Sequence, residues 1–199
     1  MEEYGISDPK EKYEKIREEQ ARLLKKSFDR VLPLDEMLAD RWKKCSLLGF
    51  GEGTSVYENV YVYGEPKVGR NVWIGPLVVL DATGGLEIGD GCEISCNVMI
   101  FTHTTHLRCV SEGKTGIIHK PVRIGDHVYV GSGAIILPGV TIGNKCIVGA
   151  GSVVTRDLPD FSVAMGVPAR VVGKVEFRND GQVEVKYFNT EEQIEKTGE

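Results

Sequence analysis

Through the middle of the chain an aliphatic residue returns at every sixth position. A period of six fits neither the 3.6-residue period of an α-helix nor the simple alternation of a flat sheet. It is typical of a hexapeptide β-helix, in which each six-residue unit forms one short side of a triangular coil and three units complete a turn. The period is carried by Val56, Val62, Val68, Ile74 and Leu80, then by Ile88, Ile94 and Ile100, and then by Ile124, Val130, Ile136, Ile142, Val148 and Val154.

Each unit also carries a small residue and a corner. Glycine often follows the periodic residue, and we expect glycine or the side chains of Asn71, Asp90 and Asn144 to tolerate the unusual dihedral angles of the corners. An aliphatic residue that points inward contributes roughly 1.5–3 kcal/mol when fully buried, but one coil cannot bury its own face, so the coils are stable only as a stack. A second inward column is predicted four residues after the first: Val72, Cys92, Val98, Val128, Ala134, Val140, Cys146 and Ser152.

Length and composition narrow the class of protein. With 199 residues the chain is long enough for one main domain with a sizeable core. A net charge of −5, with no Lys- and Arg-rich block in the repeats, argues against nucleic-acid binding. The chain shows neither a membrane-spanning apolar stretch nor a signal peptide, and its five cysteines form no C-x-x-C pair. Because Cys92 and Cys146 fall on inward positions, we expect core packing and a reducing, cytoplasmic location.

The remaining segments divide the chain into three parts. Residues 1–52 are predicted to form an N-terminal helical cap, with helices over 8–31 and about 34–44 that cover the open end of the coil. Residues 53–173 form the β-helix with a loop over 101–121, and residues 174–199 form a hairpin and a polar tail.

The loop is the main interruption of the period. Its composition includes histidines, several threonines, Arg108 and Lys114, with few inward aliphatic residues. A segment that leaves a rigid scaffold in this way often carries function. A tolerated surface insertion is the alternative.

The repeats, the histidine-bearing loop and two later motifs, GAGSVVT at 149–155 and GVPAR at 166–170, together resemble the hexapeptide-repeat acyltransferases. The likeness covers about residues 55–175. It points in particular to the sugar O-acetyltransferases, including the maltose and galactoside acetyltransferase group. It implies a left-handed parallel β-helix, assembly as a homotrimer, acetyl-CoA as donor and a sugar or polysaccharide precursor as acceptor, without a required metal or membrane insertion.

Acetyl transfer requires particular catalytic side chains. Transfer of an acetyl group from a thioester to a hydroxyl needs a base for the hydroxyl proton and a donor for the developing oxyanion. Histidine suits the base because its unperturbed pKa of about 6.5 lies near neutral pH. His103 and His106 lie where the strand turns out into the loop, and His119 lies where the loop rejoins the coil. We interpret His127 as an exposed or packing residue at a corner.

The resemblance assigns the base to His103, because the stretch Ile100–His103 is similar to the strand-to-loop stretch that carries the catalytic histidine of polysaccharide-sugar enzymes. A structural histidine at the start of the loop is the alternative, and His106 is the reserve candidate. The resemblance also places a carboxylate of the acceptor pocket at Asp81, which would bind a sugar hydroxyl or orient the base; a loop-capping Asp is the alternative. Asn97 and His106 are further acceptor-binding candidates.

Binding of the coenzyme also requires particular residue types, which can be sought in the sequence. Its thin pantetheine arm needs a groove edged by small residues, and its phosphates need cations. The stretches 131–134 and 149–152 lie one coil apart and supply the small residues, while Lys174 lies further out. Gly173 stands where galactoside-type relatives carry a basic residue. By resemblance, the positions that bind acetyl-CoA are Tyr129, Ser132, Ala150, Thr155, Arg156 and Arg170.

Other activities use the same coil. An N-acetyltransferase acting on a nucleotide-linked amino sugar is the main alternative, and the choice of O-acetylation rests on family likeness. A γ-class carbonic anhydrase would hold zinc through three histidines from two subunits. The spacing of His103, His106, His119 and His127 does not fit that pattern. A non-catalytic scaffold is a third alternative, which the histidine-bearing loop disfavours.

Overall fold

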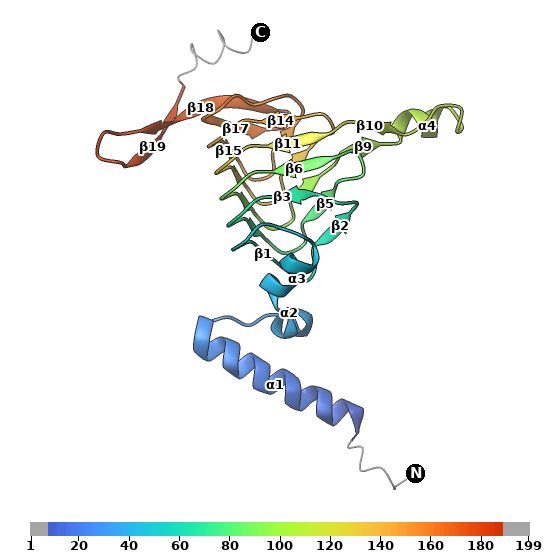
Figure 1. Cartoon of the computed structure of the whole chain (residues 1–199), viewed down its shortest axis with the longest axis vertical. Helices are drawn as coiled ribbons and strands as arrows, with labels where there is room; N and C mark the ends of the chain where they lie inside the picture. Colours follow the sequence, from blue (N-terminus) through green and yellow to red (C-terminus); the bar gives the residue numbers. More distant parts are fainter. Residues whose placement is uncertain (1–7, 189–199) are drawn as a thin grey trace. The chain divides into compact units, whose positions relative to one another are not determined.

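The computed structural model describes residues 8–188, which form two compact units divided between Asp40 and Arg41. The first unit contains helices α1 (Pro9–Phe28) and α2 (Leu34–Leu38). The second contains helix α3 (Arg41–Leu47), the β-helix and the C-terminal strands (Figure 1). In the described part of the chain no helix is long and apolar enough to cross a membrane.

The N-terminal helices follow the predicted signals in part. Asp8 caps α1 by accepting a hydrogen bond from Lys10 N at 3.1 Å, and Pro9 occupies the first turn, as the sequence predicts. The expectation of one helix over residues 34–44 is wrong. The backbone is extended at Ala39, which separates α2 from α3.

Helix α3 packs on the first strand of the β-helix, β1 (Ser55–Val56). Cys45 of this helix and Phe50 just after it are buried in the core. Lys44 Nζ donates to Tyr57 O at 3.1 Å, and the Arg41 guanidinium lies 3.4 Å from the centroid of the Tyr57 ring. These contacts cover the apolar edge of the first coil, which would otherwise face water.

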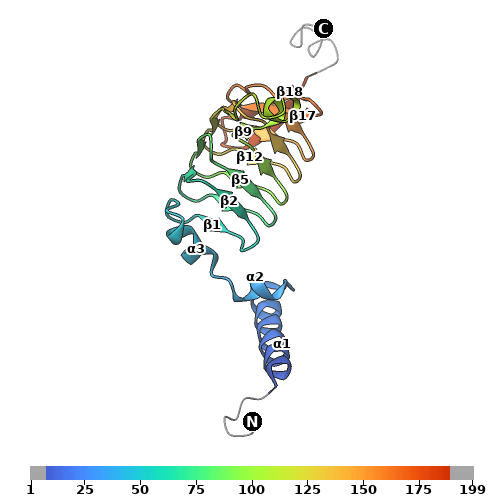
Figure 2. The same cartoon turned by 90° about the vertical axis from the view of Figure 1, so that its right-hand side faces the viewer.

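The fold is the left-handed parallel β-helix that the resemblance implies, with three flat faces (Figures 1 and 2). Each face is a sheet of short parallel strands from successive coils, paired in register. Face A consists of β1, β4 (Trp73–Ile74), β7 (Glu93–Ile94), β12 (Tyr129–Val130) and β15 (Ile147–Val148); face B of β2 (Tyr61–Tyr63), β5 (Val79–Asp81), β8 (Met99–Ile100), β13 (Ile135–Ile136) and β16 (Val153–Val154); face C of β3 (Lys67–Val68), β6 (Leu86–Ile88), β11 (Val122–Ile124) and β14 (Thr141–Ile142).

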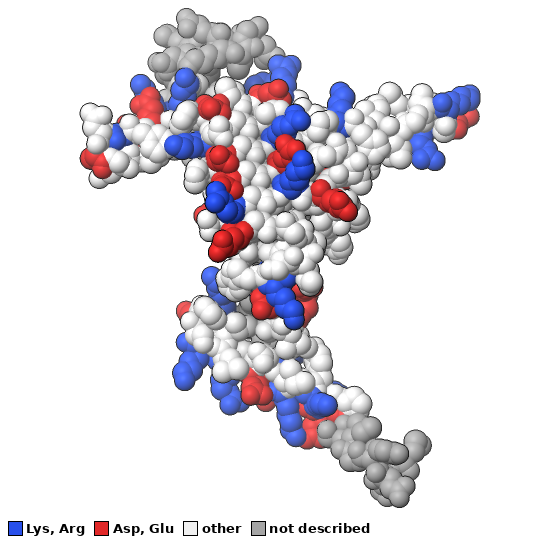
Figure 3. All heavy atoms as spheres, viewed as in Figure 1, with Lys and Arg blue, Asp and Glu red and all other residues white. Residues whose placement is uncertain are grey.

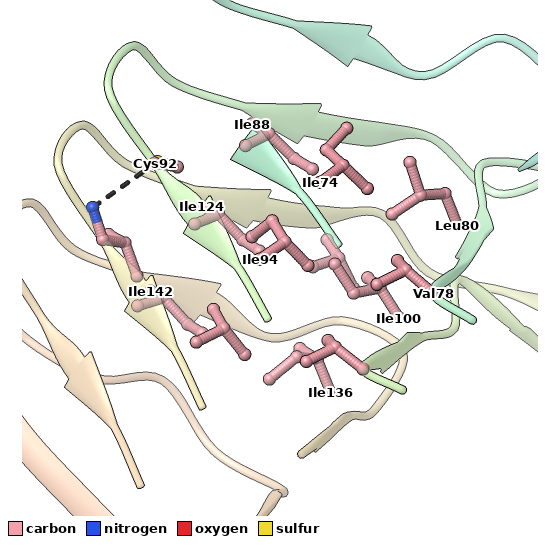
Figure 4. Packing of buried hydrophobic residues seen from close by; sticks show 14 of the residues in the cluster. Ile74, Val78, Leu80, Ile88, Cys92, Ile94, Ile100, Ile124, Ile136 and Ile142 are labelled. Atoms are coloured by element: carbon pink, nitrogen blue, oxygen red, sulfur yellow. Dashed lines mark hydrogen bonds between the residues drawn. The ribbon is translucent and has the colours of Figure 1, made fainter. Parts of the chain in front are cut away.

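The periodic residues stack into columns inside the prism (Figure 4). Ile74, Ile94, Ile100 and Ile136 are fully buried, whereas Val62 on the first coil is only partly buried. The second inward column is also confirmed, since each of its eight members is buried. Burial raises the pKa of Cys92 to about 11, so this thiol behaves as an inert core residue.

The corners differ from the expectation. Gly89 does not have a positive φ; glycine is required there because a Cβ would lie 2.3 Å from Asp126 Oδ1 on the next coil. Asn71 has the expected left-handed φ of 54°, but Asp90 and Asn144 do not. Their side chains instead accept a backbone N–H from the preceding coil, as in Asp126 N to Asn144 Oδ1 at 2.8 Å. Side chains at this corner therefore hold successive coils together.

Two segments leave the prism where the period breaks (Figure 1). The predicted loop at 101–121 is an ordered arm, in which β9 (His103–Thr104) and β10 (Ile118–His119) pair antiparallel and flank α4 (His106–Val110). After the last coil, β17 (Ser162–Gly166) extends face A and pairs antiparallel with β18 (Ala169–Phe177).

The predicted hairpin forms between β18 and β19 (Val183–Tyr187), with its turn at Asn179-Asp180-Gly181. Its first strand begins at Ala169, ahead of residue 174 where the sequence placed the start. The polar tail predicted at the C-terminus lies outside the described residues.

Candidate active site

His103, the first residue of the arm, is held by Asp81 at the end of β5. Its Nδ1 lies 2.6 Å from Asp81 Oδ2. The same oxygen accepts the backbone N–H groups of Thr102 at 2.8 Å and His103 at 3.2 Å. Asp81 therefore fixes both the position of the backbone and the orientation of the imidazole.

The Asp81 carboxylate is buried and ionised. Its side chain is 2% exposed, and Oδ1 accepts hydrogen bonds from Thr83 Oγ1 at 2.6 Å and Thr83 N at 3.1 Å. Burial alone would raise the pKa of Asp81, but the hydrogen bonds from Thr83, Thr102 and His103 outweigh it and lower the pKa to about 2. At neutral pH this carboxylate therefore only accepts hydrogen bonds.

Thr83 completes the arrangement by contacting both partners. Its Oγ1 lies 3.0 Å from His103 Nδ1 as well as 2.6 Å from Asp81 Oδ1. The one hydroxyl proton is donated to the carboxylate, so the oxygen faces Nδ1 as an acceptor. Both neighbours of Nδ1 then require a proton on that nitrogen. In the neutral ring this leaves the lone pair on Nε2 free to take a proton.

The sequence did not single out Thr83 or Thr102. Thr102 is fully buried, and its hydroxyl donates to Asp81 O and accepts from Gly84 N, both at 2.8 Å. Gly84 permits this approach, since a Cβ there would lie 2.2 Å from Thr102 O. The sequence signal for this corner is that the period lengthens from six to eight residues between Leu80 and Ile88, where Gly84-Gly85 is inserted.

The other histidines lie outside this hydrogen-bonded group. His119 pairs with His103 across the arm, with ring centroids 5.9 Å apart. His106 is exposed at the start of α4, and its Nδ1 lies 2.8 Å from Thr104 Oγ1. His127 is exposed at a corner with a φ of 55°, as interpreted from the sequence. Within residues 8–188 no three His, Cys, Asp or Glu side chains gather in a way that could hold a metal ion.

The predicted site residues lie on two edges of the prism. We call the corner between faces A and B the A/B edge, and the corner between faces B and C the B/C edge. The full width of face B separates the two sets within one chain. Asn97, Ser132 and Ala150 lie on the A/B edge with Arg170 beyond them, Asp81, His103, Thr155 and Arg156 lie on the B/C edge, and Tyr129 projects outward from face A.

The A/B edge is smooth and lined by small residues. Ser132 and Ala150 occupy equivalent positions on consecutive coils, and Gly151 N donates to Ser132 O at 2.9 Å. A Cβ on Gly131 would lie 2.6 Å from Ala150 N, so glycine permits the close stacking of this edge. Cys96, one coil earlier, places its Sγ 3.1 Å from Ser132 Oγ.

Of the two predicted arginines, Arg170 lies beyond the small residues of the A/B edge, whereas Arg156 lies on the B/C edge. Arg156 is exposed, and Arg170 is partly exposed and donates to Ala169 O at 3.2 Å. Gly173 stands where galactoside-type relatives carry a basic residue, and the packing of the C-terminal hairpin leaves no space for a side chain there. It pairs with Tyr187 in the C-terminal hairpin, where a Cβ would lie 2.6 Å from Lys186 O.

Comparisons with known proteins agree with this architecture. Residues 121–156 match the family described as hexapeptide repeat of succinyl-transferase. Nodulation protein L of Rhizobium meliloti is 53% identical over 97 residues, which are 48% of this chain and 52% of that protein. The galactoside O-acetyltransferase of Escherichia coli is 36% identical over 133 residues, which are 65% of this chain and 64% of that enzyme. The matches thus span about half to two thirds of these curated relatives.

A solved structure extends the likeness to most of the chain. The hexapeptide-repeat acetyltransferase of Vibrio cholerae superposes with a TM-score of 0.62 at 28% identity. The superposition covers 82% of this chain and 92% of that one. The repeats, the relatives and the solved fold therefore point to a single superfamily.

Proposed function

We propose that this chain, whose β-helix belongs to the hexapeptide-repeat acyltransferases, transfers an acetyl group from acetyl-CoA to a hydroxyl of a sugar or polysaccharide precursor. His103 is the general base. The observation that carries the proposal is the contact of His103 Nδ1 with Asp81 at 2.6 Å, which leaves Nε2 as the proton acceptor.

The proposed reaction moves one proton and one acetyl group. Nε2 of His103 takes the proton of the acceptor hydroxyl while the oxygen attacks the thioester carbonyl. The C–O bond forms, the C–S bond breaks, and the proton passes to the leaving thiolate to give the free thiol. Asp81 stabilises the imidazolium that exists between these steps, as the buried carboxylate of a catalytic triad does.

The predicted coenzyme positions fit the donor chemically. The edge at Ser132 and Ala150 presents small side chains and backbone groups, and beside Gly133 and Gly151 the space is open. This surface suits a thin pantetheine arm. The guanidinium groups of Arg156 and Arg170 suit phosphates, because a planar guanidinium can donate two parallel hydrogen bonds.

A homotrimer would bring the two edges together. The outward residues of face B form an apolar column in register, whereas Lys67, Glu87 and Arg123 form an ion-paired column on face C. If three copies turn face B toward a common axis, the A/B edge of one copy meets the B/C edge of the next. The site would then form between subunits. The apolar column consists of Tyr61, Val79, Met99, Ile135 and Val153.

The test compares wild type with His103→Gln, using acetyl-CoA, a panel of sugar acceptors and detection of released thiol. We expect kcat to fall by about a thousandfold or more, since general-base catalysis contributes roughly 10²–10⁴. Calorimetric binding of coenzyme A should persist. His127→Gln is the matched control, because His127 is exposed at a corner away from Asp81.

Near wild-type turnover of His103→Gln would remove His103 from the role of base. The chemical class of the product is read in the same assay. An ester that is cleaved by mild base supports O-acetylation, whereas a base-stable amide on an amino-sugar acceptor would show N-acetylation instead.

A further inference from the structure

Asp81 and His103 divide the B/C edge into two stretches, one toward the C-terminal end of the β-helix and one toward its N-terminal end. Thr155 and Arg156 lie two coils toward the C-terminal end, since β8, β13 and β16 follow one another on face B. In the proposed reaction the phosphates of the coenzyme bind at this stretch of the B/C edge, and its pantetheine arm lies on the facing A/B edge of the neighbouring copy. The acceptor hydroxyl must then reach His103 from the N-terminal stretch of the same edge, because the two substrates cannot share one surface.

Tyr63 lies on that N-terminal stretch, directly beside Asp81. In the pairing of β2 with β5, Tyr63 is the register partner of Asp81, and Ala82 N donates to Tyr63 O at 2.7 Å. Register partners on neighbouring parallel strands lie about 4.8 Å apart and project to the same side. Val62 points inward, so Tyr63 points outward, and it is 53% exposed.

Glu65 follows Tyr63 after the turn at Gly64, which has a φ of 75°. Its side chain is exposed. Among residues 8–188, neither the Tyr63 hydroxyl nor the Glu65 carboxylate has a hydrogen-bond or ion-pair partner. The coil that precedes Asp81 on this edge therefore offers one aromatic face and one carboxylate.

This pair of groups matches the chemistry of a cyclic sugar. A pyranose has an apolar face of C–H groups, which packs on an aromatic ring, and a rim of hydroxyls, which donate to a carboxylate. We infer that Tyr63 and Glu65 form the acceptor subsite, with the sugar ring stacked on Tyr63 and one of its hydroxyls directed to His103. The inference rests on the proposed acetyl transfer and narrows the acceptor to a ring sugar rather than an acyclic alcohol.

The experiment measures KM for a ring acceptor and for acetyl-CoA. The ring acceptor is whichever of methyl glucoside, methyl galactoside and methyl N-acetylglucosaminide wild type acetylates fastest, and sorbitol is the acyclic comparison. We expect Tyr63→Ala to raise the glycoside KM about tenfold and to erase the preference for the glycoside over sorbitol. The KM for acetyl-CoA should not change. Tyr63→Phe should retain most of the affinity, and Glu65→Gln should raise the glycoside KM severalfold.

The control is Tyr187→Ala, which removes a tyrosine of similar exposure from β19. If Tyr63→Ala does not fold, Tyr63→Phe and Glu65→Gln carry the test, because Glu65→Gln must still weaken the glycoside. An unchanged glycoside KM in Glu65→Gln and in every folded Tyr63 variant overturns the subsite and leaves the acetyltransferase proposal standing. A wild type that releases no thiol with any acceptor overturns the proposed function itself.

Discussion

At the scale of single residues, Asp81 is both buried and ionised. A carboxylate that loses its water is destabilised unless several hydrogen bonds replace that water. Here Thr83, Thr102 and His103 supply them, and the pKa falls to about 2 despite burial. The same hydrogen bonds orient His103, so stability and the proposed catalysis depend on one set of contacts.

This arrangement predicts a pH-dependent contribution to stability. The folded pKa of Asp81 lies below the ordinary 3.8, so its stabilisation is fully present above about pH 4 and is lost as pH falls toward 2. We expect Asp81→Asn to lower the free energy of unfolding near pH 7 by about 2 kcal/mol, since one pKa unit corresponds to about 1.4 kcal/mol. Urea unfolding at a series of pH values measures this difference in the free energy of unfolding between wild type and Asp81→Asn.

The difference between wild type and Asp81→Asn should shrink below about pH 4. Glu93→Gln, on the exposed side of face A, is the control and should show no such trend. A difference that stays constant down to about pH 2 would contradict the assigned role of the carboxylate.

The cysteines provide a second test at this scale. Cys96 is exposed beside Ser132, and Cys109 is exposed on α4, whereas the other three are buried. Alkylation of the native protein should therefore label only Cys96 and Cys109. Saturating acetyl-CoA should slow labelling of Cys96 about tenfold or more and leave Cys109 unchanged, as peptide mass mapping can show. Unprotected Cys96 would place the coenzyme away from the A/B edge.

At the scale of elements, the sequence predicts what repeats and misses what occurs once. The columns at Ile94, Ile100 and Ile136 follow from the six-residue period because each unit has the same environment. The interior of the arm could not be predicted in this way, because α4 and the pairing of His103 with His119 depend on one local hairpin. Thr83 was missed for the same reason, since its role exists only once the chain returns over Asp81.

The corner side chains also belong to this scale. Asn144 accepts the backbone N–H of Asp126, and its own N–H is donated to Asp160 at 2.7 Å. We expect Asn144→Ala to cost about 1 kcal/mol of unfolding free energy, because it leaves one backbone donor without its partner. Asn144→Asp should retain most of the stability. Urea unfolding measures both, with Asn179→Ala in the exposed hairpin turn as control, and an unaffected Asn144→Ala would show that water replaces the bond.

At the scale of the whole molecule, the three faces differ in chemistry. Blue and red side chains lie next to one another over part of the β-helix in Figure 3, and the ion pairs Lys67–Glu87 and Arg123–Glu87 are on face C. Such a face is typical of solvent exposure, whereas the uncharged column on face B is typical of a contact between subunits.

The apolar column on face B predicts that a charged side chain placed within it prevents the subunits from assembling. Ile135→Lys places a cation in the middle of the apolar column, and we expect it to convert the proposed trimer to monomers in light scattering. Activity should fall with assembly, because the two edges no longer meet. Thr141→Lys, at the exposed position of β14 on face C, should leave both assembly and activity unchanged. A trimeric and active Ile135→Lys would exclude face B as the contact.

The placement of His103 and Ser132 on opposite edges of face B has a genetic consequence. In a trimer whose sites form between subunits, a copy defective at His103 still lends an intact Ser132 edge to its neighbour. A copy defective at Ser132 still provides an intact His103 to the site that it shares with its other neighbour. Two alleles that are each inactive alone would then restore part of the turnover when co-expressed, whereas two alleles that damage the same edge would not.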